Sequence, residues 1–209
     1  STIEEQGKLT DELRRKIESC YDPTQLEDIY LPYKPKRRTK ATVAREKGLE
    51  PLAAIIMRQD GSDPERIAER FLNDQVGTID DAVDGALDII AEWVNESEAA
   101  RNSMRRLFER EAQVTSKVIK GKEQDGAKYS DYFDSSEQLR RTPSHRILAM
   151  IRGEKEGFLR LAVAPDEDRA LDALDRIFLK GDSPARPYIE DAIKDSYKRL
   201  LKPSMETEM

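Results

Sequence analysis

The chain has 209 residues, of which 36 are Lys or Arg and 42 are Asp or Glu, with a mean hydropathy of -0.76. No window approaches the run of about 18 apolar residues that a spanning helix needs, which excludes a membrane helix. The single cysteine, Cys20, cannot form an internal disulfide and is typical of a reducing compartment, so we expect a soluble, cytoplasmic protein. The net charge of -6 repels nucleic acid unless the cations are segregated.

The first forty residues predict two helices followed by an extended arm. Apolar spacing indicates a helix within 3–19. The pair Asp22 and Pro23 then indicates the start of a second, short helix over 22–29. Pro32 and Pro35 end the second helix and keep residues 30–40 extended.

Two short helices joined at a glycine are predicted next. Thr39 or Thr42 caps a helix that ends at Gly48, and Pro51 begins the second. The pair has weak helix-turn-helix character. Because residues 49–57 contain almost no polar side chains that could read bases, a buried helical hairpin is the favoured interpretation.

A further helix over 63–72 precedes a longer one that starts at about Ile79. One side of the longer helix is an apolar stripe of period 3.6, made of Val83, Ala86, Leu87, Ile90 and Val94. The other side is acidic, with Asp80, Asp81, Asp84, Asp88 and Glu92. These carboxylates predict a solvated surface rather than a metal site, because no partner helix supplies Glu-x-x-His.

After Glu98 the pattern continues as a helix towards Val118, and residues 114–119 are a weak alternative strand. Arg106, Arg110 and Lys117 would then lie along one polar edge and form a possible secondary basic face.

The rest of the chain is predicted to be helical with one strand. Residues 121–134 lack periodicity and form a loop that is a possible sub-boundary. A helix starts at Pro143, with Ile147, Leu148 and Ile151 on one face, and residues 158–164 alternate as a strand whose partner the sequence does not identify.

Two final helices follow. The first opens after Pro165 and ends at Gly181, and the second opens at Pro184 or Pro187 and is limited by Pro203. Residues 1–209 are thus predicted to be one all-α region, a multihelical scaffold with a short helix-turn-helix-like unit and at most one or two short strands.

No catalytic machinery is evident in the sequence. His145 lies at a helix start without a serine or cysteine motif, and one histidine with one cysteine cannot make a zinc site. We therefore expect a protein that is not an enzyme and uses no cofactor, metal or small-molecule substrate.

The most informative feature is a basic run over residues 34–47. It contains Lys34, Lys36, Arg37, Arg38, Lys40, Arg45 and Lys47 against one acid, Glu46, and Tyr30 and Tyr33 flank it. Such a local charge of +6 is compensated if phosphate groups bind there, with the tyrosines stacking on bases. The alternative is that these cations pair with the acidic stripe over 81–92, and charge alone does not decide between the two.

The sequence also resembles the bacterial Tex family. The similar blocks are 26–39 (LEDIYLPYKPKRRT), 44–52 (AREKGLEPL), 129–133 (YSDYF), 143–146 (PSHR) and 152–159 (RGEKEGFL). Tex-like proteins are transcription accessory factors with an amino-terminal multihelical region, an RNase H-like domain, helix-hairpin-helix units and an OB-fold RNA-binding domain. The resemblance implies that this chain is a fragment of the amino-terminal region of a longer protein.

Two functional hypotheses follow. In the first, the chain is a noncatalytic scaffold that positions nucleic-acid-binding domains and makes weak, nonspecific contact with RNA or DNA through the basic run. In the second, it docks RNA polymerase, another part of the transcription machinery, or downstream domains of its own chain without touching nucleic acid.

Overall fold

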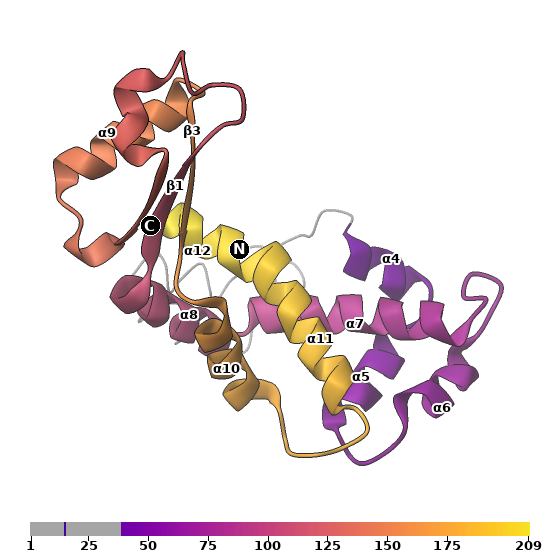
Figure 1. Cartoon of the computed structure of the whole chain (residues 1–209). Coiled ribbons are helices and arrows are strands. Elements are labelled where there is room, and N and C mark those ends of the chain that lie inside the picture. Colours follow the sequence, from indigo (N-terminus) through magenta and orange to yellow (C-terminus); the bar gives the residue numbers. More distant parts are fainter. Residues whose placement is uncertain (1–14, 16–38) are drawn as a thin grey trace. The chain divides into compact units, whose positions relative to one another are not determined.

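The computed structural model describes Arg15 and residues 39–209 (Figure 1). The helices and extended arm predicted before residue 39 lie outside the described residues. The chain divides into two compact units. Unit 1 comprises residues 1–102 and 174–200, and unit 2 comprises residues 103–173 and 201–209. The predicted sub-boundary at 121–134 lies within unit 2.

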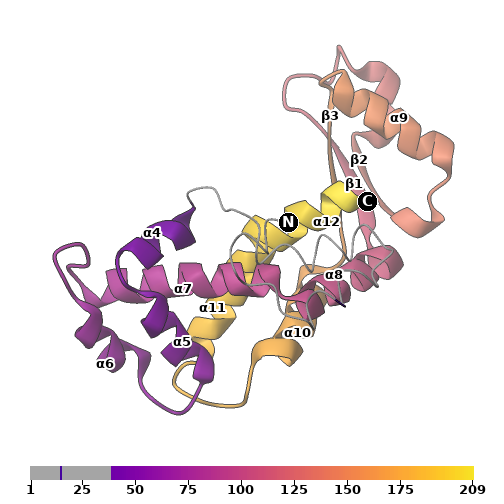
Figure 2. The same ribbon diagram turned by 180° about the vertical axis from the view of Figure 1, so that it is seen from behind.

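Unit 1 is helical and is organised around α7, against which α4, α5, α6 and α11 pack (Figures 1 and 2). Its helices are α4 (Lys40–Glu46), α5 (Glu50–Arg58), α6 (Pro64–Ala68) with the 3-10 turn η2 (Glu69–Phe71), α7 (Ile79–Glu96) and α11 (Arg186–Ser196). It also contains the start of α8 (Glu98–Glu111), the end of α10 (Glu167–Phe178) and most of the π-helical turn η5 (Tyr197–Leu201).

Local capping signals place the starts of these helices, and of the two caps predicted for α4 the structure has Thr39. The Thr39 hydroxyl accepts a hydrogen bond from the Thr42 amide at 3.2 Å, and Asp63 and Thr78 cap α6 and α7 in the same way. Pro51 lies in the first turn of α5 and Pro187 in that of α11.

The core of unit 1 forms where α4 and α5 meet α7. The turn between α4 and α5 passes through Gly48 at a φ of +80°, and Leu49, Leu52 and Ile56 are buried. At the crossing, a Cβ on Gly85 would lie 2.3 Å from Leu49 Cδ1, so α7 approaches this closely only because it has a glycine there. The apolar face of α5 is therefore in the core, in agreement with a buried helical hairpin rather than a base reader.

Unit 2 contains a three-stranded antiparallel sheet in the order β2-β1-β3. The strands are β1 (Gln113–Val118), β2 (Asp134–Gln138) and β3 (Leu159–Ala164). The other elements are the 3-10 turns η3 (Ala127–Tyr132) and η4 (Leu139–Arg141) and the helices α9 (Ser144–Lys155) and α12 (Lys202–Glu208). Both α9 and α12 contact β3, and Figure 2 shows α9 beside the strands.

The sheet corrects two predictions. The helix after Glu98 ends at Glu111 rather than continuing towards Val118, because residues 113–118 pair on both sides as β1. Strand β2 was not predicted and exceeds the expected one or two strands, since its sequence DSSEQ has little strand propensity. The partner of β3, which the sequence did not identify, is β1. The mostly helical class is confirmed.

Pro203 does not end the last helix, contrary to the prediction. The chain continues from α11 through the π-helical turn η5 into α12, where Pro203 occupies the first turn. A π-helical turn shifts the hydrogen-bond register by one residue, so the absent proline N–H falls at a break in the regular α-helical ladder.

None of the helices in the described part of the chain is long and apolar enough to cross a bilayer.

Candidate interaction site

Arg45, a cation of the basic run, is held inside unit 1 by acidic residues. Its Nη1 donates to Glu92 Oε1 at 2.9 Å, and its Nε lies 3.5 Å from Glu50 Oε2. Glu92 lies on α7 and is only 8% exposed, and it also accepts a hydrogen bond from the Thr39 hydroxyl at 3.3 Å. The charge of Arg45 is thus compensated within the fold, which is the pairing with the acidic stripe that the sequence left open.

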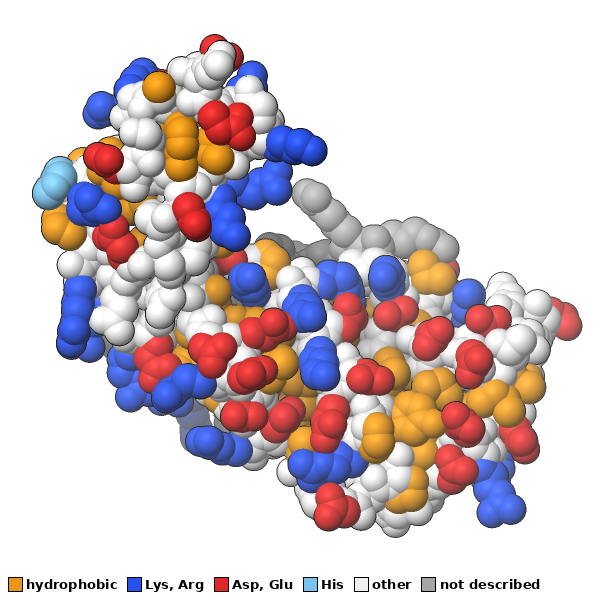
Figure 3. Space-filling model, viewed as in Figure 1, with side chains coloured by type: hydrophobic (Ala, Val, Ile, Leu, Met, Phe, Trp, Pro, Cys, Tyr) orange, Lys and Arg blue, Asp and Glu red, His pale blue; other side chains and the backbone are white. Residues whose placement is uncertain are grey.

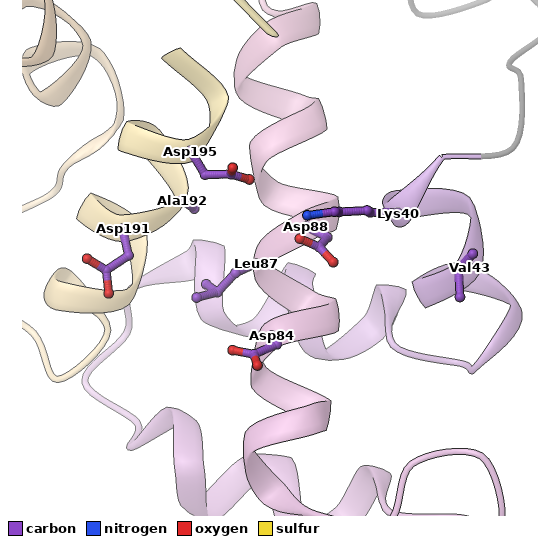
Figure 4. A pocket seen from close by; sticks show the side chains of 8 residues that line it. All are labelled: Lys40, Val43, Asp84, Leu87, Asp88, Asp191, Ala192 and Asp195. Carbon is purple, nitrogen blue, oxygen red and sulfur yellow. The ribbon is translucent and has the colours of Figure 1, made fainter. Parts of the chain in front are cut away.

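Lys40, at the start of α4, lines a groove with a volume of about 550 Å³ between α4, α7 and α11 (Figure 4). The groove is lined by Lys40, Val43, Asp84, Leu87, Asp88, Asp191, Ala192 and Asp195. Four carboxylates therefore surround an apolar floor and a single ammonium group. Figure 4 shows the Lys40 side chain reaching towards Asp88.

The carboxylates of the groove differ in their environments. Burial raises the pKa of the Asp88 carboxyl, and the positive charges of Lys40 and Arg199 partly offset this rise. Asp195 is paired with Arg199, whose Nη2 lies 2.9 Å from Asp195 Oδ2. No three acidic side chains among the described residues come together as a metal-binding group.

Asp88→Asn is expected to stabilise unit 1 at neutral pH. Folding raises the pKa of the Asp88 carboxyl above its ordinary value of 3.8, so the folded protein holds the carboxyl proton more tightly than the unfolded chain does. The free energy of unfolding therefore falls as pH rises from 3.8 through the pKa of the folded state. Asparagine does not ionise, so the gain in the free energy of unfolding should be present above the folded-state pKa and shrink as pH falls towards 3.8. Urea unfolding followed by fluorescence of Trp93, the single tryptophan, measures it.

The matched control is Asp191→Asn, an exposed carboxylate on the rim of the same groove, for which a change within about 0.5 kcal/mol is expected. A loss of stability on Asp88→Asn at neutral pH would show that attraction to Lys40 and Arg199 outweighs burial.

The structure describes only part of the rest of the basic run. The half-buried Lys47 follows α4, and its carbonyl oxygen accepts a hydrogen bond from Asn73 Nδ2 at 3.2 Å. Tyr30, Tyr33, Lys34, Lys36, Arg37 and Arg38 lie outside the described residues. Their contact with phosphate stays a prediction.

The secondary basic face is not one helix edge. Arg106 and Arg110 are exposed one turn apart on α8, but Lys117 lies on β1, because the helix ends at Glu111. In the sheet register, Lys117 stands between Asp134 on β2 and Arg160 on β3. A helical pattern over 98–118 does not bring Arg160 near Lys117. The two residues become neighbours only when residues 113–118 and 158–164 are both strands and pair with each other.

Nothing in the sequence pattern indicates that α11 completes the groove. Asp191 and Asp195 are about 100 residues from Asp88 along the chain, and their spacing of four signals only that they share a helix face. Packing of α11 on α7 brings them to the groove, aided by a 2.6 Å hydrogen bond from the buried Ser196 hydroxyl to the Ala91 carbonyl.

Comparisons with known proteins agree on one family. A family profile described as "Tex central region-like" matches residues 59–209. The transcriptional accessory protein Tex of Neisseria gonorrhoeae is 46% identical over 167 residues, which are 80% of this chain and 22% of that protein. The uncharacterized protein YdcI of Bacillus subtilis is 38% identical over 212 residues, which are 99% of this chain and 30% of that protein.

A more distant relative is the human S1 RNA-binding domain-containing protein 1, which is 28% identical over 221 residues, covering 96% of this chain and 22% of that protein. The chain spans less than a third of the length of each of these relatives.

Proposed function

Because the chain belongs to the Tex family of transcription accessory proteins, we propose that it is a noncatalytic helical scaffold of such a protein and contacts nucleic acid through its basic run. The contact is with phosphate groups and is independent of sequence. The S1 RNA-binding domain named in the human relative supports an association of the whole protein with nucleic acid.

The distribution of charge is the observation that carries this proposal. Residues 39–102 and 174–200 of unit 1 contain 13 Lys and Arg against 19 Asp and Glu, while unit 2 contains 15 of each kind. Most of unit 1 therefore repels phosphate, which supports the basic run as the place of contact on this unit. Within the run, Arg45 is already paired with Glu92, so the phosphate contacts are assigned to the cations over 34–38.

A scaffold role is supported by the packing around α7. Four helices pack on this one helix, and its inward face from Ala82 to Val94 is buried. One of the four is α4, which contains Lys40 and Arg45 of the basic run. The only histidine, His145, is exposed, and its side chain has no hydrogen-bonded serine or cysteine among the residues that the structure describes. This environment favours a binding role over acyl transfer.

The test is a titration of the whole 209-residue chain with single-stranded and duplex nucleic acid at several salt concentrations. Neutralising the four cations over 34–38 should weaken binding. It should also flatten the salt dependence, by about 0.7–0.9 in the log–log slope for each phosphate group that the protein no longer neutralises. The variant combines Lys34→Gln, Lys36→Gln, Arg37→Gln and Arg38→Gln.

A matched control removes the same charge from exposed sites elsewhere on unit 1, by Arg58→Gln, Arg66→Gln, Arg70→Gln and Lys194→Gln. The control should bind much more tightly than the variant of the basic run. Equal affinity and equal salt slope for the two quadruple variants would exclude the basic run as the binding site, because the effect would then be one of net charge alone.

A further inference from the structure

Helix α9 in unit 2 has one buried and one exposed side. Met150 and Gly153 are on the buried side, where a Cβ on Gly153 would lie 2.5 Å from Leu159 Cδ1 of β3. On the opposite side, Leu148 is 61% exposed and Ile151 is 38% exposed. The side of α9 that packs on the sheet is thus not the side that carries its exposed aliphatic residues.

The exposed side is also basic. Its residues are His145, Leu148, Ile151, Arg152 and Lys155, which lie within one face because each is three or four positions along the helix from another of the set. All five are exposed. We call this set the outer face of α9.

The nearby carboxylates have contacts of their own within unit 2. Glu154 accepts a hydrogen bond from the Leu161 amide at 2.9 Å. Glu156, just after α9, accepts one from the Tyr129 hydroxyl at 2.8 Å and lies 3.0 Å from Lys128 Nζ. In the described part of the chain, Arg152 and Lys155 form no ion pair.

This combination differs from the other exposed aliphatic residues. Leu72, Ile177 and Met209 lie far apart in the sequence, and none has another exposed large aliphatic residue one turn away, as is common on protein surfaces. On α9, by contrast, two large aliphatic side chains lie one turn apart and are bordered by cations, so one small surface offers both apolar and charged contacts. Figure 3 shows hydrophobic and basic side chains beside the histidine, which is coloured pale blue.

We propose that the outer face of α9 binds an acidic amphipathic helix of a protein partner. Apolar side chains of the partner would cover Leu148 and Ile151, and its Asp and Glu residues would pair with Arg152 and Lys155. The 12 residues of α9 extend over about 18 Å, which matches three turns of a helix laid along it. A contact of this size is smaller than a standard interface, so it is expected to be transient, with a dissociation constant in the micromolar range.

Nucleic acid fits this surface less well. Its phosphates would match the cations, but bases stack on aromatic rings, and the outer face contains two aliphatic residues and no Phe, Tyr or Trp. This proposal does not depend on the basic run and concerns the other unit of the chain.

The test uses fluorescence anisotropy with a labelled helical peptide of about 14 residues, four turns long, that carries leucines on one face and glutamates beside them. The same composition in scrambled order is the reference peptide. Leu148→Ser with Ile151→Ser is expected to weaken binding of the ordered peptide at least tenfold. Arg152→Glu with Lys155→Glu is expected to do the same, and a peptide with lysines in place of glutamates should recover binding to this second variant.

The control for loss of an exposed leucine is Leu72→Ser on unit 1, which should bind the peptide as the wild type does. The quadruple variant of the basic run should also bind it normally, which separates this proposal from the proposed function. The proposal is overturned if the ordered peptide binds no better than the scrambled one. It is also overturned if the charge reversals abolish binding of a single-stranded oligonucleotide and leave peptide binding unchanged, because the outer face would then be a nucleic-acid surface.

Discussion

Leu49→Ala is expected to lower the free energy of unfolding of unit 1 by about 2–5 kcal/mol. Leu49 is 1% exposed and lies at the turn from α4 into α5, against α7 at Gly85. Truncating it leaves a cavity where three helices meet, and those helices cannot all move to fill it. Fluorescence of Trp93 on α7 follows the unfolding of unit 1 in urea, because this is the chain's single tryptophan.

Gly85→Ala tests the same contact from the other side. The new Cβ would lie 2.3 Å from Leu49 Cδ1, and overpacking of this kind lowers stability by about 1–3 kcal/mol. Replacing a helical glycine recovers about 0.5–1 kcal/mol of helix propensity, so a smaller net loss is expected. In the double variant with Leu49→Ala the obstructing methyl group is absent, so the double variant should be more stable than the two single effects predict, by about 0.5–3 kcal/mol.

Gly77→Ala is the matched control, because no heavy atom lies within 4 Å of the Cβ that it would add. Its effect should be within about 0.5 kcal/mol. Simple additivity of Leu49→Ala and Gly85→Ala would contradict the close approach of α5 and α7.

The helices were predicted well because their signals are local. A cap such as Thr39 or Asp63 and a proline such as Pro51 act within one turn of the chain, so the sequence alone places the starts of α4, α5 and α6. Strand pairing is not local. Residues 113–118 have both helical and strand character, and contacts with β2 and β3 decide in favour of a strand.

The two interaction surfaces also depend on contacts between residues that are far apart in the sequence. The basic run and the acidic stripe were both evident in the sequence, but only the packing of α4 on α7 brings Arg45 to Glu92. Similarly, the apolar spacing of Leu148 and Ile151 was evident, whereas spacing does not reveal which side of a helix another element covers. Helical periodicity predicts that the apolar face of a helix is buried. In α9, however, β3 packs on the side that carries Gly153, and Leu148 and Ile151 stay exposed.

Glu92→Ala is expected to lower the free energy of unfolding of unit 1 by about 2–3 kcal/mol, again measured with Trp93 fluorescence in urea. Removing one partner of a fully buried ion pair costs about 3–5 kcal/mol, because the other charge is left without compensation. The Arg45 side chain is 24% exposed and lies near Glu50, which reduces the loss. Asp84→Asn, an exposed carboxylate on the same helix, is the control and should change stability by less than about 0.5 kcal/mol.

Replacing both Arg45 and Glu92 distinguishes a structural role of this ion pair from a role of Arg45 in binding nucleic acid. Arg45→Met with Glu92→Leu removes both charges and fills the space with apolar atoms, so it should be more stable than Glu92→Ala and close to the wild type. Because Arg45 is already paired within unit 1, this double variant should also bind nucleic acid with the salt dependence of the wild type. If the log–log slope of the salt dependence is flatter by about the value of one phosphate contact, Arg45 itself contacts nucleic acid. The ion pair of Arg45 with Glu92 on α7 would then be a contact that opens when nucleic acid binds.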